Sequence, residues 1–447
     1  MSIKKRVLKN SVASLLDKIS KITEQLLLVP FFILYWGVDY YGDWITLTIL
    51  PTFFALANLG FGTATGNTFV LKYGAEDKKG AANTVKTGLY VMHIGIFFIV
   101  LFSIIILEIL SYFDVFSDLK MSAYDAKWSI FFMFSSAVAT FYLAIFECFY
   151  RVAHQAHLGI FLKAIATFIK VGFAIVILFA GAHALEFSLL IFIITLITNI
   201  IYIYLAVKFL KFKEYEKANF DKNEALFLFK KGFGYFLSPL WQAVYFQGTT
   251  FIIRIVLGPS AVVLFNTLRT LVNSSSQAFN VIVNAIYPEF QLAVAERDLN
   301  KAKKLYIYLL AINVVIALGA SMFLILFGDY VYGWWTHHQI NVPTVVWILM
   351  IIRIIFYALW YSYSFVFEAN NMPYPLTITG VIVAIISVGI TWICASLWGI
   401  VGGAIGILCF DVLMFLILKK LSNSFIRVNL KDYFFILRNI SKFLRKG

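Results

Sequence analysis

The sequence predicts an all-α, polytopic membrane protein of about 12 transmembrane helices, arranged as two six-helix bundles. Hydrophobic residues make up 61% of the chain and charged residues 13%, whereas soluble proteins carry about 25% charged residues. Apolar segments of roughly 20 residues recur along the chain, a length that crosses a bilayer as a helix. Basic residues cluster in short loops at alternate ends of these segments. Membrane topology therefore explains the net charge of +14, and we expect no nucleic-acid partner.

The apolar segments form two sets of six, separated by a hydrophilic, lysine-rich stretch. We place the first set at residues 11–36, 44–70, 86–110, 127–150, 156–181 and 186–207. We place the second set at residues 232–257, 262–289, 304–327, 344–368, 374–397 and 400–418. The predicted organisation is an N-terminal bundle (1–207), a cytoplasmic linker (208–231), a C-terminal bundle (232–420) and a cytoplasmic basic tail (421–447). The tail has two interpretations, an amphipathic helix on the inner leaflet or a disordered basic segment.

The distribution of lysine and arginine predicts the orientation. Loops on the side of the N-terminus contain 28 of the 37 basic residues, and the opposite loops contain two, Lys120 and Lys127. The positive-inside rule therefore places both termini and the linker in the cytoplasm.

The two sets of spans are related by an internal repeat. A shift of 221 residues aligns Gly37 with Gly258 and Asp77 with Asp298, and it also aligns Glu147 with Glu368. Apolar matches are common in this composition, whereas matched glycines and acids at one offset are not. Because each half has an even number of spans, the repeats are parallel, about an axis normal to the membrane.

Charged side chains inside a bilayer are costly and normally face a cavity, so each is a candidate functional residue. In the first span, Asp17, Lys21 and Glu24 fall within about 60° of one helical face. The alternative for these three is a helical turn still in water with internal ion pairs. The fourth span contributes Glu147 and the fifth contributes Lys170.

The eighth span carries one polar stripe at steps of three and four residues, made of Asn266, Arg269, Asn273, Gln277, Asn280 and Asn284. Such a stripe can serve hydrogen bonding between helices. A stripe that spans the whole helix and includes an arginine favours a water-filled lumen instead.

The candidates divide by sign of charge. The cations expected to line a cavity and bind cargo are Lys21, Lys170, Arg254, Arg269 and Arg353. The acids considered for ion coupling are Asp17, Glu24, Glu147, Glu368 and Asp411. Asp411 lies in the middle of an apolar span, where it either takes up a proton or Na⁺ during transport or serves as structural hydrogen-bonding glue. The excess of cations predicts an anionic cargo, and arginine suits phosphate groups particularly well.

The sequence lacks the motifs of several common chemistries. No GxxxxGK[ST] sequence is present, which argues against ATP as the direct energy source. No HExxH or paired CxxC motif occurs, so we expect no metal site and no cofactor. The glycines of GFGTATG (residues 60–66) lie within a span, where close helix packing explains them.

A set of residues near the first two spans resembles a known family: Pro30, Gly37, Tyr41-Gly42, Trp44 and the turn Leu59-Gly60-Phe61-Gly62. Together with the basic loop after the second span, they resemble the polysaccharide-exporter branch of the multidrug/oligosaccharidyl-lipid/polysaccharide (MOP) flippase superfamily, especially the Wzx-type O-antigen flippases.

The resemblance implies a V-shaped pair of bundles with an alternately opened, cation-lined cavity. The implied cargo is a polyprenyl-diphosphate-linked oligosaccharide for lipopolysaccharide O-antigen or capsule, moved from the inner to the outer leaflet of the bacterial inner membrane. Lys21, Arg254, Arg269 and Arg353 would meet its diphosphate or acidic sugars. The family also implies coupling to an H⁺ or Na⁺ gradient and a polysaccharide polymerase as an assembly partner.

Two rival functions stand beside this expectation. A cation-coupled multidrug extruder of the same superfamily would favour an acidic, aromatic cavity, whereas the excess here is positive. A membrane glycosyltransferase or polymerase would carry a large outer loop with catalytic acids, and the longest outer loop here is short. We therefore expect a transporter and not an enzyme.

Overall fold

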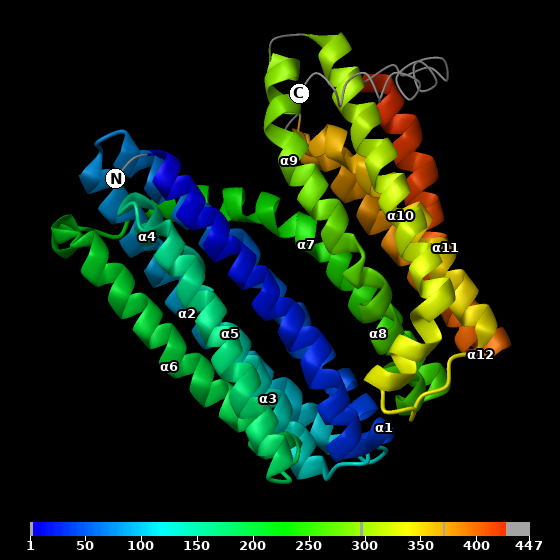
Figure 1. The fold of residues 1–447 in the computed structure, drawn as a ribbon. Coiled ribbons are helices and arrows are strands. Elements are labelled where there is room, and N and C mark those ends of the chain that lie inside the picture. Colours follow the sequence, from blue (N-terminus) through cyan, green and yellow to red (C-terminus); the bar gives the residue numbers. More distant parts are fainter. Residues whose placement is uncertain (1–2, 296–297, 370–371, 426–447) are drawn as a thin grey trace. The chain divides into compact units, whose positions relative to one another are not determined.

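A computed structural model describes residues 3–295, 298–369 and 372–425, and in these ranges all regular structure is helical (Figure 1). The chain forms two compact units, which divide between Ala243 and Val244. The helices before the division are α1 (Ile3–Gly74), α2 (Lys78–Tyr112), α3 (Ala123–Ala139), η1 (Thr140–Tyr142), α4 (Leu143–Val152), α5 (Ala156–Phe179), α6 (Ala184–Leu210) and η2 (Lys213–Lys217). Helix α7 (Lys222–Leu257) contains the division, and α8 (Pro259–Ser274), α9 (Ser276–Ala295), α10 (Leu299–Trp335), α11 (Thr344–Ala369) and α12 (Pro373–Phe425) follow it.

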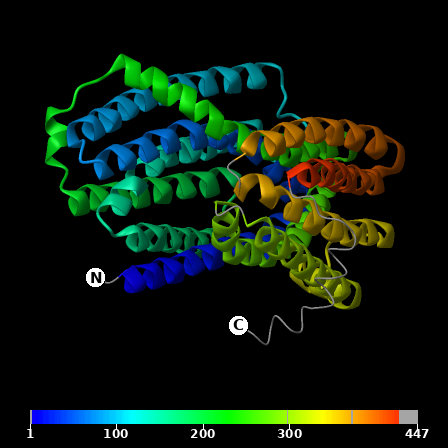
Figure 2. The ribbon, with the colours of Figure 1, turned by 90° about the horizontal axis from the view of Figure 1, so that it is seen from above.

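Each predicted span is helical, although the helices do not map one to one onto the spans. Helix α1 contains the first two spans, joined at the non-helical Gly37, and α12 contains the last two, joined at Trp398 and Gly399. The fourth span is divided into α3, η1 and α4, and the eighth into α8 and α9. Among the described residues, eight helices are long and apolar enough to cross a membrane. The all-α, multi-pass prediction is confirmed, and Figure 2 shows the long helices of each unit running side by side.

The internal repeat is visible in the backbone. Gly37 has φ 73° and ψ 168°, and its repeat partner Gly258 has φ 87° and ψ −177°. This region is accessible to glycine and strained for other residues. Asp77 caps α2 by accepting a hydrogen bond from the Gly80 amide at 2.8 Å, and Asp298 caps α10 by accepting one from the Lys301 amide at 2.9 Å. The offset of 221 residues therefore aligns equivalent bends and equivalent helix caps.

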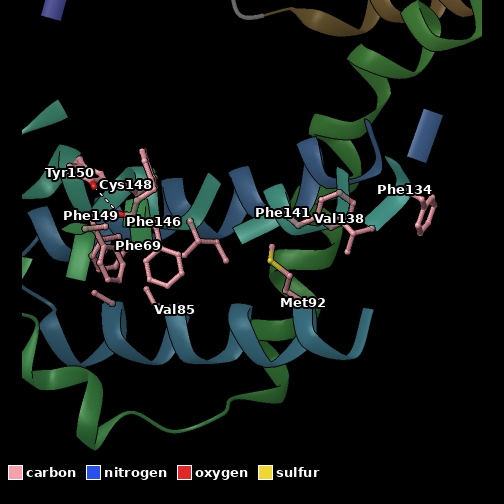
Figure 3. Close-up of a cluster of buried hydrophobic side chains, with 14 residues drawn as sticks. Phe69, Val85, Met92, Phe134, Val138, Phe141, Phe146, Cys148, Phe149 and Tyr150 are labelled. Atoms are coloured by element: carbon pink, nitrogen blue, oxygen red, sulfur yellow. Dashed lines mark hydrogen bonds between the residues drawn. The ribbon is translucent and has the colours of Figure 1, made fainter. Parts of the chain in front are cut away.

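A cluster of aromatic and aliphatic side chains forms the core of the first unit (Figure 3). The Phe69 and Phe146 rings each lie 5.1 Å from the ring of Phe149, and the Tyr150 hydroxyl donates to the Tyr202 carbonyl at 2.8 Å. A Cβ on Gly66 would lie 2.9 Å from the backbone oxygen of Ala144 in α4. The glycine-rich stretch of α1 thus permits close approach of two helices, as the sequence predicts.

The predicted linker is an ordered part of the first unit. Side chains of α2 bind its backbone through three contacts: Lys86 Nζ to the Ala218 oxygen at 2.7 Å, the Asn219 amide to Asn83 Oδ1 at 2.9 Å, and the Asp221 amide to Thr87 Oγ1 at 3.0 Å. Helix α7 begins inside the predicted linker, at Lys222, and Glu224 forms an ion pair with Lys72 of α1 at 2.8 Å. The prediction for the basic tail falls on residues outside the described part of the chain, except for the end of α12.

Candidate functional site

The second unit contains a buried ion pair between α11 and α12. Arg353 Nε donates to Asp411 Oδ2 at 2.6 Å, and the two residues are 2% and 0% exposed. Trp360 follows Arg353 by two helical turns on the same face of α11, and its Nε1 donates to Asp411 Oδ1 at 2.7 Å. Both oxygens of the carboxylate therefore accept hydrogen bonds, as a buried charge requires.

The break between α8 and α9 lies beside this pair. Ser274, Ser275 and Ser276 each donate a hydroxyl hydrogen bond to the carbonyl three residues earlier, at 2.6, 2.7 and 2.5 Å. Such local bonds compete with the helical ladder and explain the interruption. Asn273 directly precedes these serines, and its Oδ1 accepts from Arg353 Nη1 at 2.8 Å. Asn273, Ser275, Ser276, Arg353 and Tyr357 line a small cavity at the break.

Arg269 of α8 is buried without a carboxylate among its hydrogen-bond acceptors in the described residues. Its Nη1 donates to the Phe246 carbonyl and to Thr249 Oγ1, both at 3.2 Å. Its Nη2 donates to Thr250 Oγ1 at 3.1 Å and to Asn266 Oδ1. The guanidinium carbon also lies 5.0 Å from the centroid of the Phe246 ring, within cation–π range. Neutral oxygens and an aromatic face thus solvate this cation.

Most of the predicted polar stripe of α8 and α9 is engaged inside the second unit. Asn266 and Asn273 bind the two arginines, and Asn280 Oδ1 accepts from the Tyr361 hydroxyl of α11. Gln277 is exposed, and the side chain of Asn284 lies outside the described set. In this conformation the stripe joins helices to one another, which is the alternative use that the sequence left open.

The first unit has its own ion cluster, at the end of α4. Glu147 Oε1 accepts from Arg151 Nη2 at 2.9 Å, and Glu147 Oε2 accepts from Lys163 of α5. Arg151 Nη1 also donates to Asn67 Oδ1 of α1 at 3.4 Å. One carboxylate is therefore shared by two cations from two helices, and the cluster is partly exposed.

The other candidate residues lie apart from these two clusters. Asp17 and Lys21 pair at 2.7 Å within α1, and the Lys21 side chain is exposed. This matches the alternative of an internal ion pair near the start of the first span. Glu24, Lys170 and Arg254 are half-buried, and Glu368 is exposed.

Part of the site around Arg269 is not evident from the sequence. Phe246, Thr249 and Thr250 of α7 supply its acceptors, yet they are ordinary residues for a membrane helix. The available signal was a pair of consecutive threonines in the helix before the arginine. Helical periodicity places them on a helix but does not say which residue of the next helix they meet.

No protein-family model matches the chain, and no curated protein matches it. Solved structures do. An inward-facing multidrug resistance MATE family transporter of the MOP superfamily has a TM-score of 0.66 at 17% identity, with 94% of this chain and 98% of that chain covered. An outward-facing structure of such a transporter has a TM-score of 0.63 at 17% identity, over 95% and 96% of the two chains.

The chain has the fold of MOP-superfamily transporters. A third such structure, a MOP superfamily transporter from Pyrococcus furiosus, has a TM-score of 0.61 at 16% identity, over 95% of this chain and 96% of that chain. Its description reports a binding pocket of reverse polarity and suggests a different function for that protein. The similarity confirms the predicted two-bundle, multi-pass fold, and the proteins that share this fold here are transporters. At 16–17% identity the similarity shows the fold and does not indicate which cargo is bound.

Proposed function

We propose that this protein is a secondary transporter that moves an amphipathic molecule with an anionic head group across a bacterial cytoplasmic membrane. The observation that carries the proposal is the charge of the two clusters, the partly exposed one in the first unit and the buried one in the second. In the first unit, Arg151 and Lys163 share the single carboxylate of Glu147. In the second unit, Arg353 is balanced by Asp411, whereas Arg269 binds neutral oxygens. Each unit thus holds one more cation than carboxylate in its cluster.

A buried guanidinium with neutral partners suits an anionic ligand. Hydroxyl and carbonyl oxygens satisfy its hydrogen bonds but supply no opposite charge, so an arriving phosphate gains a charge-assisted interaction that they do not offer. In the described conformation Arg269 and Arg353 are both bound inside the second unit. Contact with cargo therefore requires these side chains to exchange partners during the transport cycle.

Among anionic amphipaths, a polyprenyl-diphosphate-linked oligosaccharide fits the resemblance noted in the sequence. The transporter would carry it from the inner to the outer leaflet, with both termini cytoplasmic, and deliver it to polysaccharide assembly. Asp411 is our candidate for coupling to H⁺ or Na⁺, because uptake of either ion would weaken its pairing with Arg353.

A multidrug extruder is the second candidate, and the structural comparison supports it at least as well. The MATE transporters that share this fold are described as multidrug resistance proteins. An extruder of cationic drugs needs an accessible acid or aromatic surface. Among the candidate coupling acids, Glu368 is exposed, whereas Asp17, Glu24 and Glu147 are half-buried. The charge balance favours the first candidate, and the fold similarity favours the second.

Lipid extracts from a strain that lacks the gene separate the two functions. Accumulated polyprenyl-diphosphate glycans, identified by mass spectrometry and accompanied by loss of surface polysaccharide, establish the flippase. Normal glycolipids together with new sensitivity to cationic drugs establish the extruder. Complementation with Arg269→Gln should fail to restore export, whereas Lys79→Gln, which removes one exposed cation, should restore it. Wild-type export by Arg269→Gln protein that is present at the wild-type level would refute a role for this cation.

A further inference from the structure

The first turns of α7 have two opposite faces with different partners. At 100° per residue, Glu224, Leu228, Lys231 and Gly232 fall on one face. The opposite face carries Lys222, Leu226, Phe229, Lys230 and Phe233, and we call this set the outer face of α7.

The inner face is fixed to the rest of the first unit. Glu224 Oε1 contacts Lys72 Nζ at 2.8 Å and the Thr84 hydroxyl at 2.5 Å, and Leu228 is fully buried. Lys231 Nζ donates to Thr68 Oγ1 at 3.3 Å. A Cβ on Gly232 would lie 3.0 Å from the Phe61 Cα of α1, so the two helices are in close contact there. The rotation of this part of α7 about its axis is therefore determined.

This rotation places three large, mostly exposed apolar side chains on the face opposite these contacts. Leu226, Phe229 and Phe233 are 56%, 66% and 60% exposed, and Lys222 and Lys230 beside them are exposed as well. Asp221, which precedes Lys222, is engaged as the cap of α7, where its Oδ1 accepts from the Asn223 amide at 2.8 Å. The outer face is thus apolar and basic at once.

We propose that the outer face of α7 binds anionic phospholipids of the cytoplasmic leaflet. An apolar stripe flanked by lysines is the pattern by which helices lie in the membrane interface, with rings among the acyl chains and ammonium groups at the phosphates. The lysines suit the negative potential of that leaflet, and the charge distribution of the loops places this part of the chain on the cytoplasmic side. Helix α7 also continues without interruption from this face into a predicted membrane span.

The inference uses none of the residues of the candidate cargo site, so it stands or falls independently of the proposed function. It assigns a role to the ordered linker: its hydrogen bonds to α2 and α1 present the outer face to the lipid in one fixed rotation. Because α7 contains the division between the two units, a lipid bound here contacts the helix that both units share.

Photo-crosslinking tests the contact directly in the full-length protein. We would incorporate p-benzoylphenylalanine at Phe229 and reconstitute the protein in phosphatidylcholine vesicles with one quarter phosphatidylglycerol. The expected result is a phospholipid adduct, detected by mass spectrometry, in which phosphatidylglycerol exceeds its share of the bilayer. The same residue at Lys79, an exposed loop position, should give no enrichment. Absence of a lipid adduct at position 229, or an adduct to another protein, overturns the proposal.

A charge variant tests the preference for anionic lipid. The double variant Lys222→Gln/Lys230→Gln removes the two lysines of the outer face, and Lys79→Gln/Lys217→Gln removes two exposed lysines elsewhere in the first unit. Phosphatidylglycerol added to the detergent-solubilised protein should raise its melting temperature. Because each lysine strengthens binding roughly fivefold, the lipid concentration that gives half of this rise should be about 30-fold higher for the first variant. Equal titrations of the two variants, or equal stabilisation by phosphatidylcholine, refute an anionic site. If the first variant fails to fold, the crosslinking result decides.

Discussion

Replacing Asp411 with asparagine should destabilise the second unit strongly. The substitution keeps the shape of the side chain and leaves an oxygen to accept from Trp360, so the main change is loss of the negative charge. Arg353 then stays as a buried cation with an amide and Asn273 for partners. Removing one member of a buried ion pair in this way costs about 3–5 kcal/mol, because the remaining charge is uncompensated.

A second substitution, at Arg353, allows the interaction between Arg353 and Asp411 to be measured. In the double variant Arg353→Gln/Asp411→Asn both charges are gone, while hydrogen-bonding groups remain at both positions. We expect it to be more stable than Asp411→Asn alone, with a coupling free energy of about 2–3 kcal/mol between the two sites.

Thermal unfolding in detergent, followed by the loss of monodisperse protein, provides the measurement. A unit of about 200 residues loses roughly 2–4 °C per kcal/mol, so Asp411→Asn should lower the melting temperature by about 6–20 °C. Asp17→Asn breaks the Asp17–Lys21 pair, in which the lysine is exposed, and should lower it by no more than about 4 °C. Equal effects of the two substitutions, or strictly additive effects in the double variant, would show that the buried pair does not act as described.

Three further predictions concern the first unit. Gly66→Ala should destabilise the protein by about 1–3 kcal/mol, because the new methyl meets the α4 backbone. In the same melting assay, Gly95→Ala should be neutral or stabilising, because a Cβ there meets open space. Gly37→Ala should cost about 1–3 kcal/mol through backbone strain alone, since its Cβ would meet nothing within 4 Å; a neutral result would show that the bend does not require glycine. Glu224→Gln should speed proteolytic cleavage in the linker by weakening its anchor to α1, and Glu216→Gln, at an exposed position, should leave the rate unchanged.

Helix positions and the repeat could be predicted from the sequence because both depend on local properties. The length of the apolar segments predicts the membrane spans, and one offset that matches glycines with glycines and acids with acids predicts the repeat. Gly37 and Gly258 then adopt the same backbone conformation, and Asp77 and Asp298 cap equivalent helices.

The pairing of side chains between helices could not be predicted. Arg353 and Asp411 were each recognised as intramembrane charges, but periodicity fixes only the face of a helix. It does not fix the height or rotation of one helix against another. The stripe on α8 and α9 shows the same limit, because the period that would line a lumen equally serves to contact α7 and α11. The interruption at Ser275 depends on hydroxyl groups that bond their own backbone, which a hydropathy pattern does not register.

The bends at Gly37 and Gly258 carry a historical implication. Two glycines at equivalent positions with the same rare conformation point to an ancestral half that already contained the bend before its gene was duplicated. The buried ion pair has no such counterpart: at the same offset of 221 residues, Arg353 corresponds to Phe132 and Asp411 to Leu190. Arg269 likewise corresponds to Thr48. The bends and helix caps thus occur in both halves, whereas the buried charges Arg269, Arg353 and Asp411 occur in only one.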